Sequence, residues 1–543
     1  MARDESIDYL VVGAGPAGLQ AGYYLQKAGR SYVIVEAGSI PGTFFTRFPR
    51  HRKLISINKV HTGWDDPELN LRTDWNSLLS DESTPLFSHH SSRYFPEAED
   101  MLGYLSDFAT THDLHVRYNT RITSISRPDN DFVARTEDGS TFRAKRMIVA
   151  TGVSRPYIPP IEGVEHAARY DEVSVDPADF TGQRVLIIGR GNSAFETADN
   201  LIETASVIHV AGPGSLKLAW RTHFVGHLRA VNNNFLDTYQ LKSQNALLDG
   251  NIEYIRRNDD SSYSVAVSFS RVQEVVKEIR YDRVILATGF RFDASIFEPE
   301  CRPELTIKDR FPAQTDAWES TNVPDLYFAG TITQVRDFKK STSGFIHGFR
   351  YGVRALHRIL ERRYHGTPWP ARTLDATPDG VAEAVIERVN RTSALWQMFG
   401  FLGDAVLVDG DGGVRYCDEV PLDHLHTAVA DGRFGDVARY LTVTLEYGAD
   451  HDKVDPFDIT AGRVSQQSTA GLDGRYLHPV VRLHTPGGGE EAQAEHHITE
   501  NLENEWDSEE VHRQPLLRFL SEQRFLHGRL GGHDHDQVPA GRP

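Results

Sequence analysis

The stretch IIGRGNSAFE, residues 187–196, is an apolar run that ends in a glycine-rich turn. Within it, Gly189, Gly191 and Ala194 follow the pattern G-x-G-x-x-A. A strand that passes through such a turn into a helix is typical of a dinucleotide-binding βαβ unit, because the glycines let the backbone approach a pyrophosphate. The stretch therefore predicts one such unit, with Asn192 and Ser193 completing its turn.

A similar turn lies near the start of the chain, in VVGAGPAG at residues 11–18. Residues 7–13 read as a buried parallel strand, 16–29 as a helix and 31–36 as the next strand. The pyrophosphate is expected at the helix N-terminus. The residues predicted to hold it are Gly13, Gly15, Pro16, Ala17 and Gly18.

The two units differ at the end of their second strand. The first ends in Glu36, and a carboxylate there binds both hydroxyls of an adenosine ribose and repels a 2′-phosphate, which favours FAD or NAD. The strand at 205–212 ends without a carboxylate, and Lys217 and Arg221 follow, which favours NADP. The alternatives are a purely structural second unit and, for the two cations, solvated surface charges.

Two dinucleotide sites in one chain suggest a flavin that stays bound and a nicotinamide that exchanges. Hydride would then pass from nicotinamide to flavin, with the protein supplying position and electrostatics. We therefore predict that the cofactors are FAD and NADPH.

Three further stretches fit this plan. The strings ATG at 150–152 and ATGF at 287–290 look like strand ends where the chain crosses between domains close to a cofactor. Gly330 is expected to let the backbone meet the ribityl or phosphate of the flavin. A helix starting near Ser343 would aim its N-terminal dipole at the flavin ring. The candidate cofactor contacts in these stretches are Ala150, Thr151, Gly152, Thr288, Gly289, Gly330, Gly344 and Phe345.

The fold class expected is α/β, with two nested Rossmann-like domains and a C-terminal extension of mixed or helical structure. An NADPH-binding domain at 161–290 would split an FAD-binding domain made of residues 1–160 and 291–365. Residues 366–543 form the extension, with a helical pattern at 381–408. The Gly-, Glu- and His-rich stretches near its end are predicted to be partly disordered.

Bulk properties exclude several function classes. The 543 residues carry a net charge of −18, which argues against nucleic-acid binding. Cys301 and Cys417 cannot form a C-x-x-C pair, so a dithiol centre is not expected. No apolar run is long enough to span a membrane, and neither a signal peptide nor an ER-retention sequence is recognised, so the cytoplasm is the expected compartment. No metal site is predicted, because the His-Asp run at 533–536 is more typical of a solvated tail. A homo-oligomer is left open.

Several long strings resemble a known family. They include PGTFFTRFPRHRKLISINK at 41–59, NNNFLDTYQLKS at 232–243 and SGFIHGFRYG at 343–352. These are similar to the FAD-dependent oxidoreductase domain-containing family, whose animal member is the ER flavoprotein associated with degradation. DRVILATGF at 282–290 is similar to a motif of N-hydroxylating monooxygenases. The resemblance implies FAD, NADPH and two nested α/β domains. The ER partnership does not carry over, and the flavin monooxygenase signature is echoed only loosely at 161–170.

By the same resemblance, Asn58 lies where flavin-containing monooxygenases have an asparagine that faces the flavin. Its amide is expected to donate to a flavin C4a-hydroperoxide and to the nicotinamide; the alternative is an asparagine that closes a turn. The basic run from Arg47 to Lys53 is either a solvated face or a phosphate contact. Trp75 and Asn76 are candidates for the substrate pocket, and His223, His227 and His347 for acid–base chemistry.

The predicted function is an NADPH-dependent FAD monooxygenase that uses molecular oxygen to N-hydroxylate a small-molecule amine. One alternative is an NADPH-dependent flavin reductase or oxidase that passes electrons to a partner. The other is a flavin-stabilised interaction protein that recognises a polypeptide.

Overall fold

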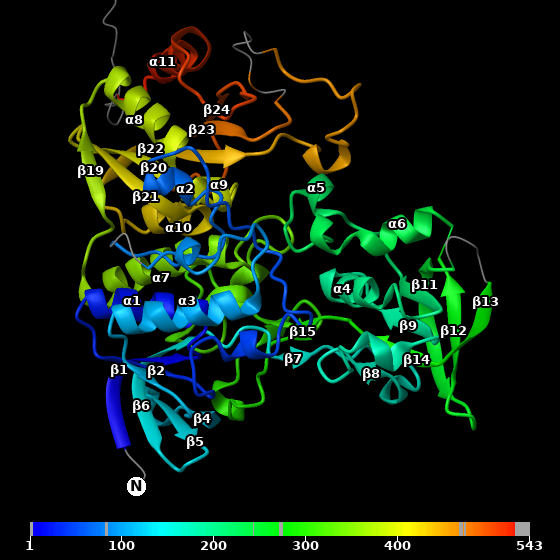
Figure 1. The fold of residues 1–543 in the computed structure, drawn as a ribbon. Coiled ribbons are helices and arrows are strands. Elements are labelled where there is room, and N and C mark those ends of the chain that lie inside the picture. Colours follow the sequence, from blue (N-terminus) through cyan, green and yellow to red (C-terminus); the bar gives the residue numbers. More distant parts are fainter. Residues whose placement is uncertain are drawn as a thin grey trace, which may run out of the picture. The chain divides into compact units, whose positions relative to one another are not determined.

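The chain divides into two compact units. A computed structural model describes residues 4–81, 85–242, 244–270, 275–465, 471 and 474–526. The first unit comprises Met1–Leu360 and Asp450–Ala461, and the second comprises Glu361–Ala449 and Gly462–Pro543. Figure 1 shows the helices and strands of both units.

The first sheet of the first unit contains the N-terminal glycine turn. Its strand order is β3-β2-β1-β6-β5-β4, and β18 also pairs with β6. The strands are β1 (Asp4–Val12), β2 (Tyr32–Val35), β3 (Val116–Arg117), β4 (Ile122–Ser126), β5 (Phe132–Thr136), β6 (Thr141–Val149) and β18 (Leu326–Phe328). Strands β1, β2, β3, β6 and β18 run parallel to one another. These parallel strands are rich in apolar residues because helices cover them.

Helices α1 and α3 lie side by side on one side of this sheet (Figure 1). The helices of this part are α1 (Pro16–Lys27), α2 (Pro67–Asn70), α3 (Ala98–Thr111) and α7 (Ile346–His365). On α1, Gly22 faces Ile34 of β2, and a Cβ there would lie 2.5 Å from the Ile34 Cδ1. Small residues at such positions let α1 pack close to the sheet.

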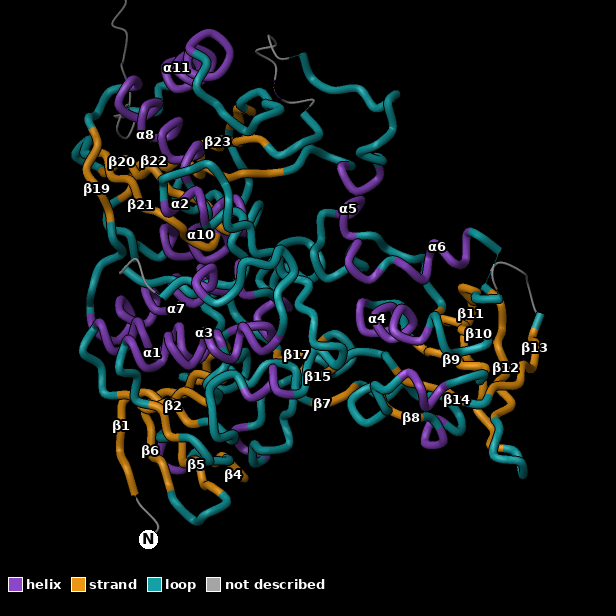
Figure 2. Tube along the Cα trace, in the orientation of Figure 1, coloured by secondary structure: helices purple, strands orange, loops and turns teal. Residues whose placement is uncertain are grey.

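The second sheet contains the other glycine turn. Its order is β13-β12-β11-β10-β9-β14-β8. The strands are β8 (Ala168–Arg169), β9 (Arg184–Ile188), β10 (Val207–Gly212), β11 (Ala246–Arg257), β12 (Tyr263–Phe269), β13 (Val276–Tyr281) and β14 (Arg283–Leu286), and the helices are α4 (Asn192–Leu201), α5 (Ala219–Thr222) and α6 (Asn234–Gln240). Strands β11, β12 and β13 form an antiparallel meander at one edge. Figure 2 shows the two sheets of this unit as separate groups of strands.

Two short crossings join the two sheets. β7 (Arg155–Pro156) leads into the second sheet and β15 (Phe290–Arg291) leads out of it, and they pair antiparallel. A small hairpin of β16 (Leu305–Thr306) and β17 (Phe311–Pro312) follows. The second sheet is therefore inserted into the chain of the first, which confirms the predicted nested α/β fold.

The second unit contains a six-stranded sheet of order β19-β21-β20-β22-β23-β24. Its strands are β19 (Ala371–Leu374), β20 (Leu402–Asp409), β21 (Val414–Pro421), β22 (Val437–Glu446), β23 (His478–His484) and β24 (Ala494–His497), and its helices are α8 (Pro378–Arg391), α9 (Ala394–Gln397), α10 (Leu422–Ala430) and α11 (Gln514–Glu522). Every strand pair in this sheet is antiparallel.

Two sequence predictions for this extension are wrong in part. The helical pattern at 381–408 breaks at β20, because a short apolar run fits a fully buried strand as well as a helix. The Gly- and Glu-rich stretch ends in β24, whose backbone pairs with β23 despite its polar sequence. The remaining tail, residues 527–543 with the His-Asp run, lies outside the described residues.

Within the part of the chain that the structure describes, no helix combines the length and the apolar character needed to cross a lipid bilayer. Among the same residues, no three His, Cys, Asp or Glu side chains are grouped as a metal site.

Candidate active site

The first glycine turn connects β1 to α1. Gly13 has φ +104°, and a Cβ added to it would lie 2.9 Å from the carbonyl oxygen of Ala150. A Cβ at Gly18 would lie 1.8 Å from the carbonyl oxygen of Gly13, so both positions require glycine. At Gly15, by contrast, no heavy atom lies within 4 Å of the Cβ position, and α1 has no side-chain cap. The helix N-terminus thus offers backbone N–H groups and open space to an anion.

Glu36 follows β2 at the same edge of the sheet. Its Oε2 accepts a hydrogen bond of 2.9 Å from Ala14 N, and its Oε1 accepts one of 2.8 Å from Gly38 N. These bonds fix the buried carboxylate, and each oxygen retains capacity to accept from a ribose hydroxyl. This arrangement fits the adenosine of FAD.

The second turn repeats the first. Gly189 has φ +135°, and a Cβ added to it would lie 2.1 Å from the carbonyl oxygen of Ala287. Gly191 has open space around its Cβ position and begins α4 without a side-chain cap. Each predicted ATG string is therefore the close neighbour of a glycine turn: Ala150 for the first turn and Ala287 for the second.

A small pocket opens beside the second turn. Strands β10 to β13 lie on one side of β9, and β14 lies on the other side. The strand order therefore reverses between β9 and β14. The pocket is lined by Pro156, Tyr157, Ile158, Arg169, Tyr170, Asp171, Ser193, Leu286, Ala287, Thr288, Gly289 and Phe290. In open α/β sheets, ligands bind at the carboxyl ends of the strands at such a switch point.

A loop of the first domain, residues 47–50, contacts the second domain and is called the latch here. Arg47 and Arg50 donate to the carbonyl oxygens of Asp171 and Val173, at 3.3 and 2.6 Å. The Tyr170 hydroxyl accepts from Arg50 N at 3.2 Å and donates to the Glu196 carboxylate on α4. At these two arginines the basic run contacts the second domain, and whether it also meets a phosphate stays a prediction. It holds the two dinucleotide folds together.

Residues 10–330 match the family described as pyridine nucleotide-disulphide oxidoreductase. The chain belongs to this family. It is also 39% identical over 558 residues to FAD-dependent oxidoreductase domain-containing protein 2 of Mus musculus, covering 94% of this chain and 83% of the mouse protein. The protein of the same name from Danio rerio is 37% identical over 580 residues, covering 95% and 83%. The predicted family resemblance is confirmed, and the chain is an FAD-dependent oxidoreductase.

Among solved structures, a flavin-containing monooxygenase from Stenotrophomonas maltophilia matches with a TM-score of 0.52 and 23% identity. The match covers 66% of this chain and 98% of the monooxygenase. At this identity the likeness shows the two-dinucleotide-domain fold.

In the second turn of this oxidoreductase, the glycine pattern does not single out Arg190, which lies between Gly189 and Gly191. The Arg190 side chain crosses the end of β10, where it donates to the carbonyl oxygen of Gly214 and to Asp249 Oδ1, the latter at 2.5 Å. A cation therefore lies where an NAD-binding protein has its ribose carboxylate. Lys217 and Arg221 are exposed, and no described residue forms an ion pair with either.

The predicted cofactor contact of Asn192 stays a prediction, and its side chain holds a loop. Its Nδ2 donates to the carbonyl oxygen of His227 at 2.8 Å, and its Oδ1 accepts from Arg229 N at 3.0 Å. Its neighbours fit the prediction better, since Ser193 lines the pocket and Ala194 packs in the core. Asn192 positions residues 226–232 beside the turn.

The predicted donor role of Asn58 conflicts with its hydrogen bonds. Its Nδ2 donates to the carbonyl oxygens of Ser91 and Arg93, at 2.7 and 3.3 Å, so both amide protons are already engaged. What remains is Oδ1, a buried acceptor to which no described residue donates. A flipped amide would set its oxygen against two carbonyl oxygens, so the observed orientation is the favourable one.

The predicted flavin-side residues gather at the start of α7. A Cβ at Gly330 would lie 2.7 Å from the Cβ of Ala17, so this turn abuts α1. Gly344 faces Gln334, and the Phe345 ring lies 5.8 Å from that of Phe224. The helix starts at Ile346, close to the predicted position.

The first turn of α7 contains His347, which is part of an aromatic stack. The Trp75 ring lies 4.2 Å from His347, and the Arg229 guanidinium lies 5.1 Å from the Trp75 ring centre. His347 is 1% exposed, no described residue hydrogen-bonds to its ring nitrogens, and burial holds its pKa well below the usual value. Burial therefore favours the neutral form of His347. Asn76 is structural, since it donates to the carbonyl oxygen of Ile57 at 3.0 Å.

The residues of the first glycine turn test whether FAD fits. The Glu36 carboxylate is fixed by two backbone N–H groups and can still accept from a ribose hydroxyl, and the position of a Cβ at Gly15 is open to a pyrophosphate. These residues fit FAD.

Proposed function

We propose that this oxidoreductase is an NADPH-dependent FAD monooxygenase that uses molecular oxygen to hydroxylate the nitrogen of a small-molecule amine. The balanced reaction takes NADPH, a proton, oxygen and the amine to NADP⁺, water and the hydroxylated amine. Bound FAD supplies the hydride acceptor and the reactivity with oxygen. The observation that carries the proposal is the second glycine turn: β10 ends without the carboxylate of NAD-specific folds, and Arg190, which is ion-paired with Asp249, crosses its end.

In this proposal, one group of residues binds FAD and a second group binds NADPH. The first turn and Glu36 hold FAD. The second turn, Ser193 and the neighbouring pocket hold NADPH, with its pyrophosphate at the N-terminus of α4. The latch at Tyr170 keeps the two folds in one arrangement, which favours direct hydride transfer between neighbouring cofactors.

The cysteines argue against passing electrons to a disulfide within the chain. Cys301 is buried and donates to the carbonyl oxygen of Ile125, and burial raises its pKa to about 11. Cys417 is buried in β21 of the second unit. A reactive dithiol needs two exposed thiols, and both of these thiols are buried.

A second candidate is a reductase or oxidase that passes electrons to a partner or releases peroxide. The engaged amide of Asn58 favours it, since the hydrogen-bond donor implied by the monooxygenase resemblance is already used.

Paired measurements of NADPH oxidation and peroxide release separate the two. A monooxygenase should release less peroxide per NADPH when a suitable amine is added, with hydroxylated amine in its place. Peroxide equal to the NADPH consumed, across a broad panel of amines, would contradict the proposal and support the oxidase.

A further inference from the structure

A segment from the C-terminal region belongs to the first unit. Residues Asp450–Ala461, called the strap here, follow β22 in sequence but cluster with the N-terminal residues. The strap's short helix at His451–Lys453 contacts α5, as Figure 1 shows. The rings of Phe457 and Trp220 lie 5.2 Å apart, and those of His451 and His223 are also 5.2 Å apart.

Hydrogen bonds within the strap hold its backbone in turns on both sides of Phe457. Asp455 Oδ1 accepts from Phe457 N at 2.9 Å, and Asp458 Oδ1 accepts from Thr460 N at 2.8 Å. Asp450 Oδ1 pairs with Lys453 at 2.5 Å. Because side-chain oxygens that bond to nearby backbone N–H groups stabilise turns, the backbone at Phe457 is held in one conformation, and its ring packs against Trp220.

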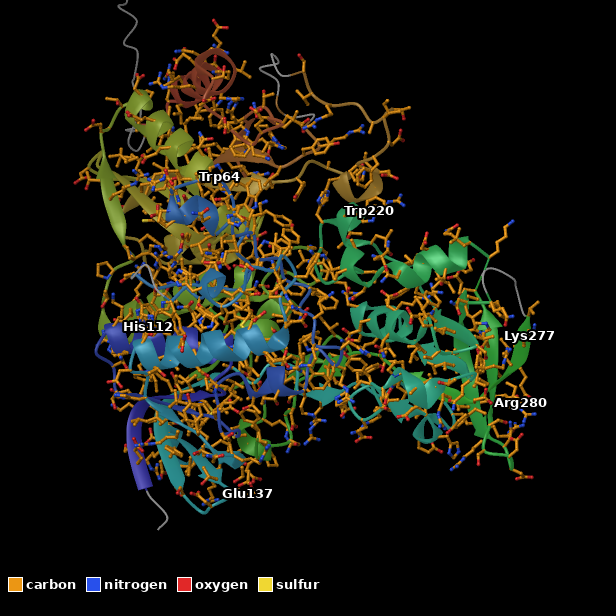
Figure 3. All side chains as sticks on the ribbon, in the orientation of Figure 1. Trp64, His112, Glu137, Trp220, Lys277 and Arg280 are labelled. Carbon is orange, nitrogen blue, oxygen red and sulfur yellow. The ribbon has the colours of Figure 1, made fainter. Side chains whose placement is uncertain are left out.

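The two rings together form an open aromatic face. Trp220 is 37% exposed and Phe457 is 79% exposed. Figure 3 labels Trp220 on α5. Lys217 and Arg221 flank Trp220 in sequence, are exposed, and have no ion-pair partner among the described residues. Aromatic rings beside unpaired cations suit a ligand with both a flat base and a negative charge.

Hydrogen bonds tie this face to the second glycine turn. Ala219 N donates to the carbonyl oxygen of Leu228 at 3.0 Å, and Leu228 N donates to that of Lys217 at 3.0 Å. The next residue, Arg229, is held by Asn192 at the start of α4. The face is therefore part of the same domain surface as the turn that would bind a pyrophosphate.

We propose that Trp220 and Phe457 form the adenine-binding face of the NADPH site, with Lys217 and Arg221 receiving the 2′-phosphate. The strap then gives the C-terminal region a direct part in nucleotide binding. This inference rests on the proposed use of NADPH.

The test measures binding of 2′,5′-ADP and of AMP to the full-length, FAD-loaded chain by calorimetry. 2′,5′-ADP carries the adenine and the 2′-phosphate of NADPH without the nicotinamide, and AMP lacks the 2′-phosphate. Phe457→Ala should weaken both ligands at least fivefold, since it removes one stacked ring, and Phe457→Tyr should restore binding. Arg221→Gln should weaken 2′,5′-ADP and leave AMP unchanged.

Ile459→Ala is the matched control, because Ile459 lies on the same strap and is 99% exposed. It should bind both ligands as the unchanged chain does. FAD content and melting temperature should be the same in all variants. In addition, 2′,5′-ADP should quench tryptophan fluorescence, and Trp220→Phe should abolish most of that quenching.

Unchanged affinity in Phe457→Ala and undiminished quenching in Trp220→Phe would overturn the adenine site while leaving the proposed function intact. A chain that binds FAD but neither binds 2′,5′-ADP nor is reduced by NADPH would instead contradict the proposed function itself.

Discussion

At the scale of single residues, Glu36 gives the first prediction. Its carboxylate is held by Ala14 N and Gly38 N and remains able to accept from the FAD ribose. In Glu36→Gln, the new NH₂ group would face one of these backbone donors. Since hydrogen bonds to a charged group contribute about 1.5–3 kcal/mol, we expect FAD to dissociate roughly tenfold more readily. Flavin release, followed by fluorescence, measures this.

The matched control is Glu137→Gln. Glu137 is 74% exposed, is labelled in Figure 3, and lies 4.0 Å from Arg121. It should release FAD at the rate of the unchanged chain. Equal FAD retention in Glu36→Gln and Glu137→Gln would show that Glu36 does not anchor the cofactor.

Two glycines of the second turn give a contrasting pair. In Gly189→Ala the new Cβ would lie 2.1 Å from the carbonyl oxygen of Ala287, so we expect a lower melting temperature. In Gly191→Ala the Cβ has open space, so the fold should keep its stability. That same Cβ would occupy space needed by the pyrophosphate, so the KM for NADPH should rise.

Thermal melts of both variants measure the expected change in stability, and NADPH titrations measure the expected change in KM. If Gly191→Ala bound NADPH normally, the pyrophosphate would have to lie elsewhere.

A sequence pattern is most informative where a single position has one physical requirement. The glycines and Glu36 were predicted because the turn admits few alternatives. The partners of Asn58 lie 33 and 35 residues along the chain, and Arg190 pairs with a residue 59 positions away. No local pattern could reveal those hydrogen bonds.

At the scale of elements, the latch between the two dinucleotide folds gives a prediction about pH. Burial raises the pKa of Glu196 from 4.5 to about 7, although the Tyr170 hydroxyl opposes this by donating to the carboxylate. Between these two values the folded chain keeps the proton that the unfolded chain releases. The stability linked to Glu196 is therefore full below pH 4.5 and is lost as pH rises through about 7.

Glu196→Gln should remove this loss, because an amide stays neutral and can still accept from Tyr170. At about 1.4 kcal/mol per pKa unit, the gain above pH 7 is at most about 3–4 kcal/mol. Melting temperatures of both proteins across this pH range measure it: the curves should converge in acid and separate above neutrality. Parallel curves would contradict the buried ionisation of Glu196.

Elements were predicted well where glycine turns mark their ends. The strand, helix and strand expected at 7–13, 16–29 and 31–36 appear as β1, α1 and β2 within a few residues. The crossings β7 and β15 have two residues each and carry no periodic signal. The latch loop was recognised as unusual, but its role depends on carbonyl groups far away in the sequence.

At the scale of the whole molecule, the nested arrangement was predicted because the two turns and two ATG strings occur in a fixed order. The sheet of the second unit was not, since its buried strand β20 reads like a continuation of the helical pattern before it. The membership of the strap in the first unit depends on contacts such as that between Phe457 and Trp220, more than 200 positions apart in sequence, so only the fold could reveal it.

The central claim is that NADPH reduces FAD bound to this chain. The most direct measurement mixes the FAD-loaded protein with NADPH or NADH without oxygen and follows the visible flavin absorbance in a stopped-flow instrument. The account predicts rapid bleaching by NADPH and much slower bleaching by NADH at equal concentration. A flavin that stays oxidised with NADPH, or is bleached equally fast by NADH, would contradict it.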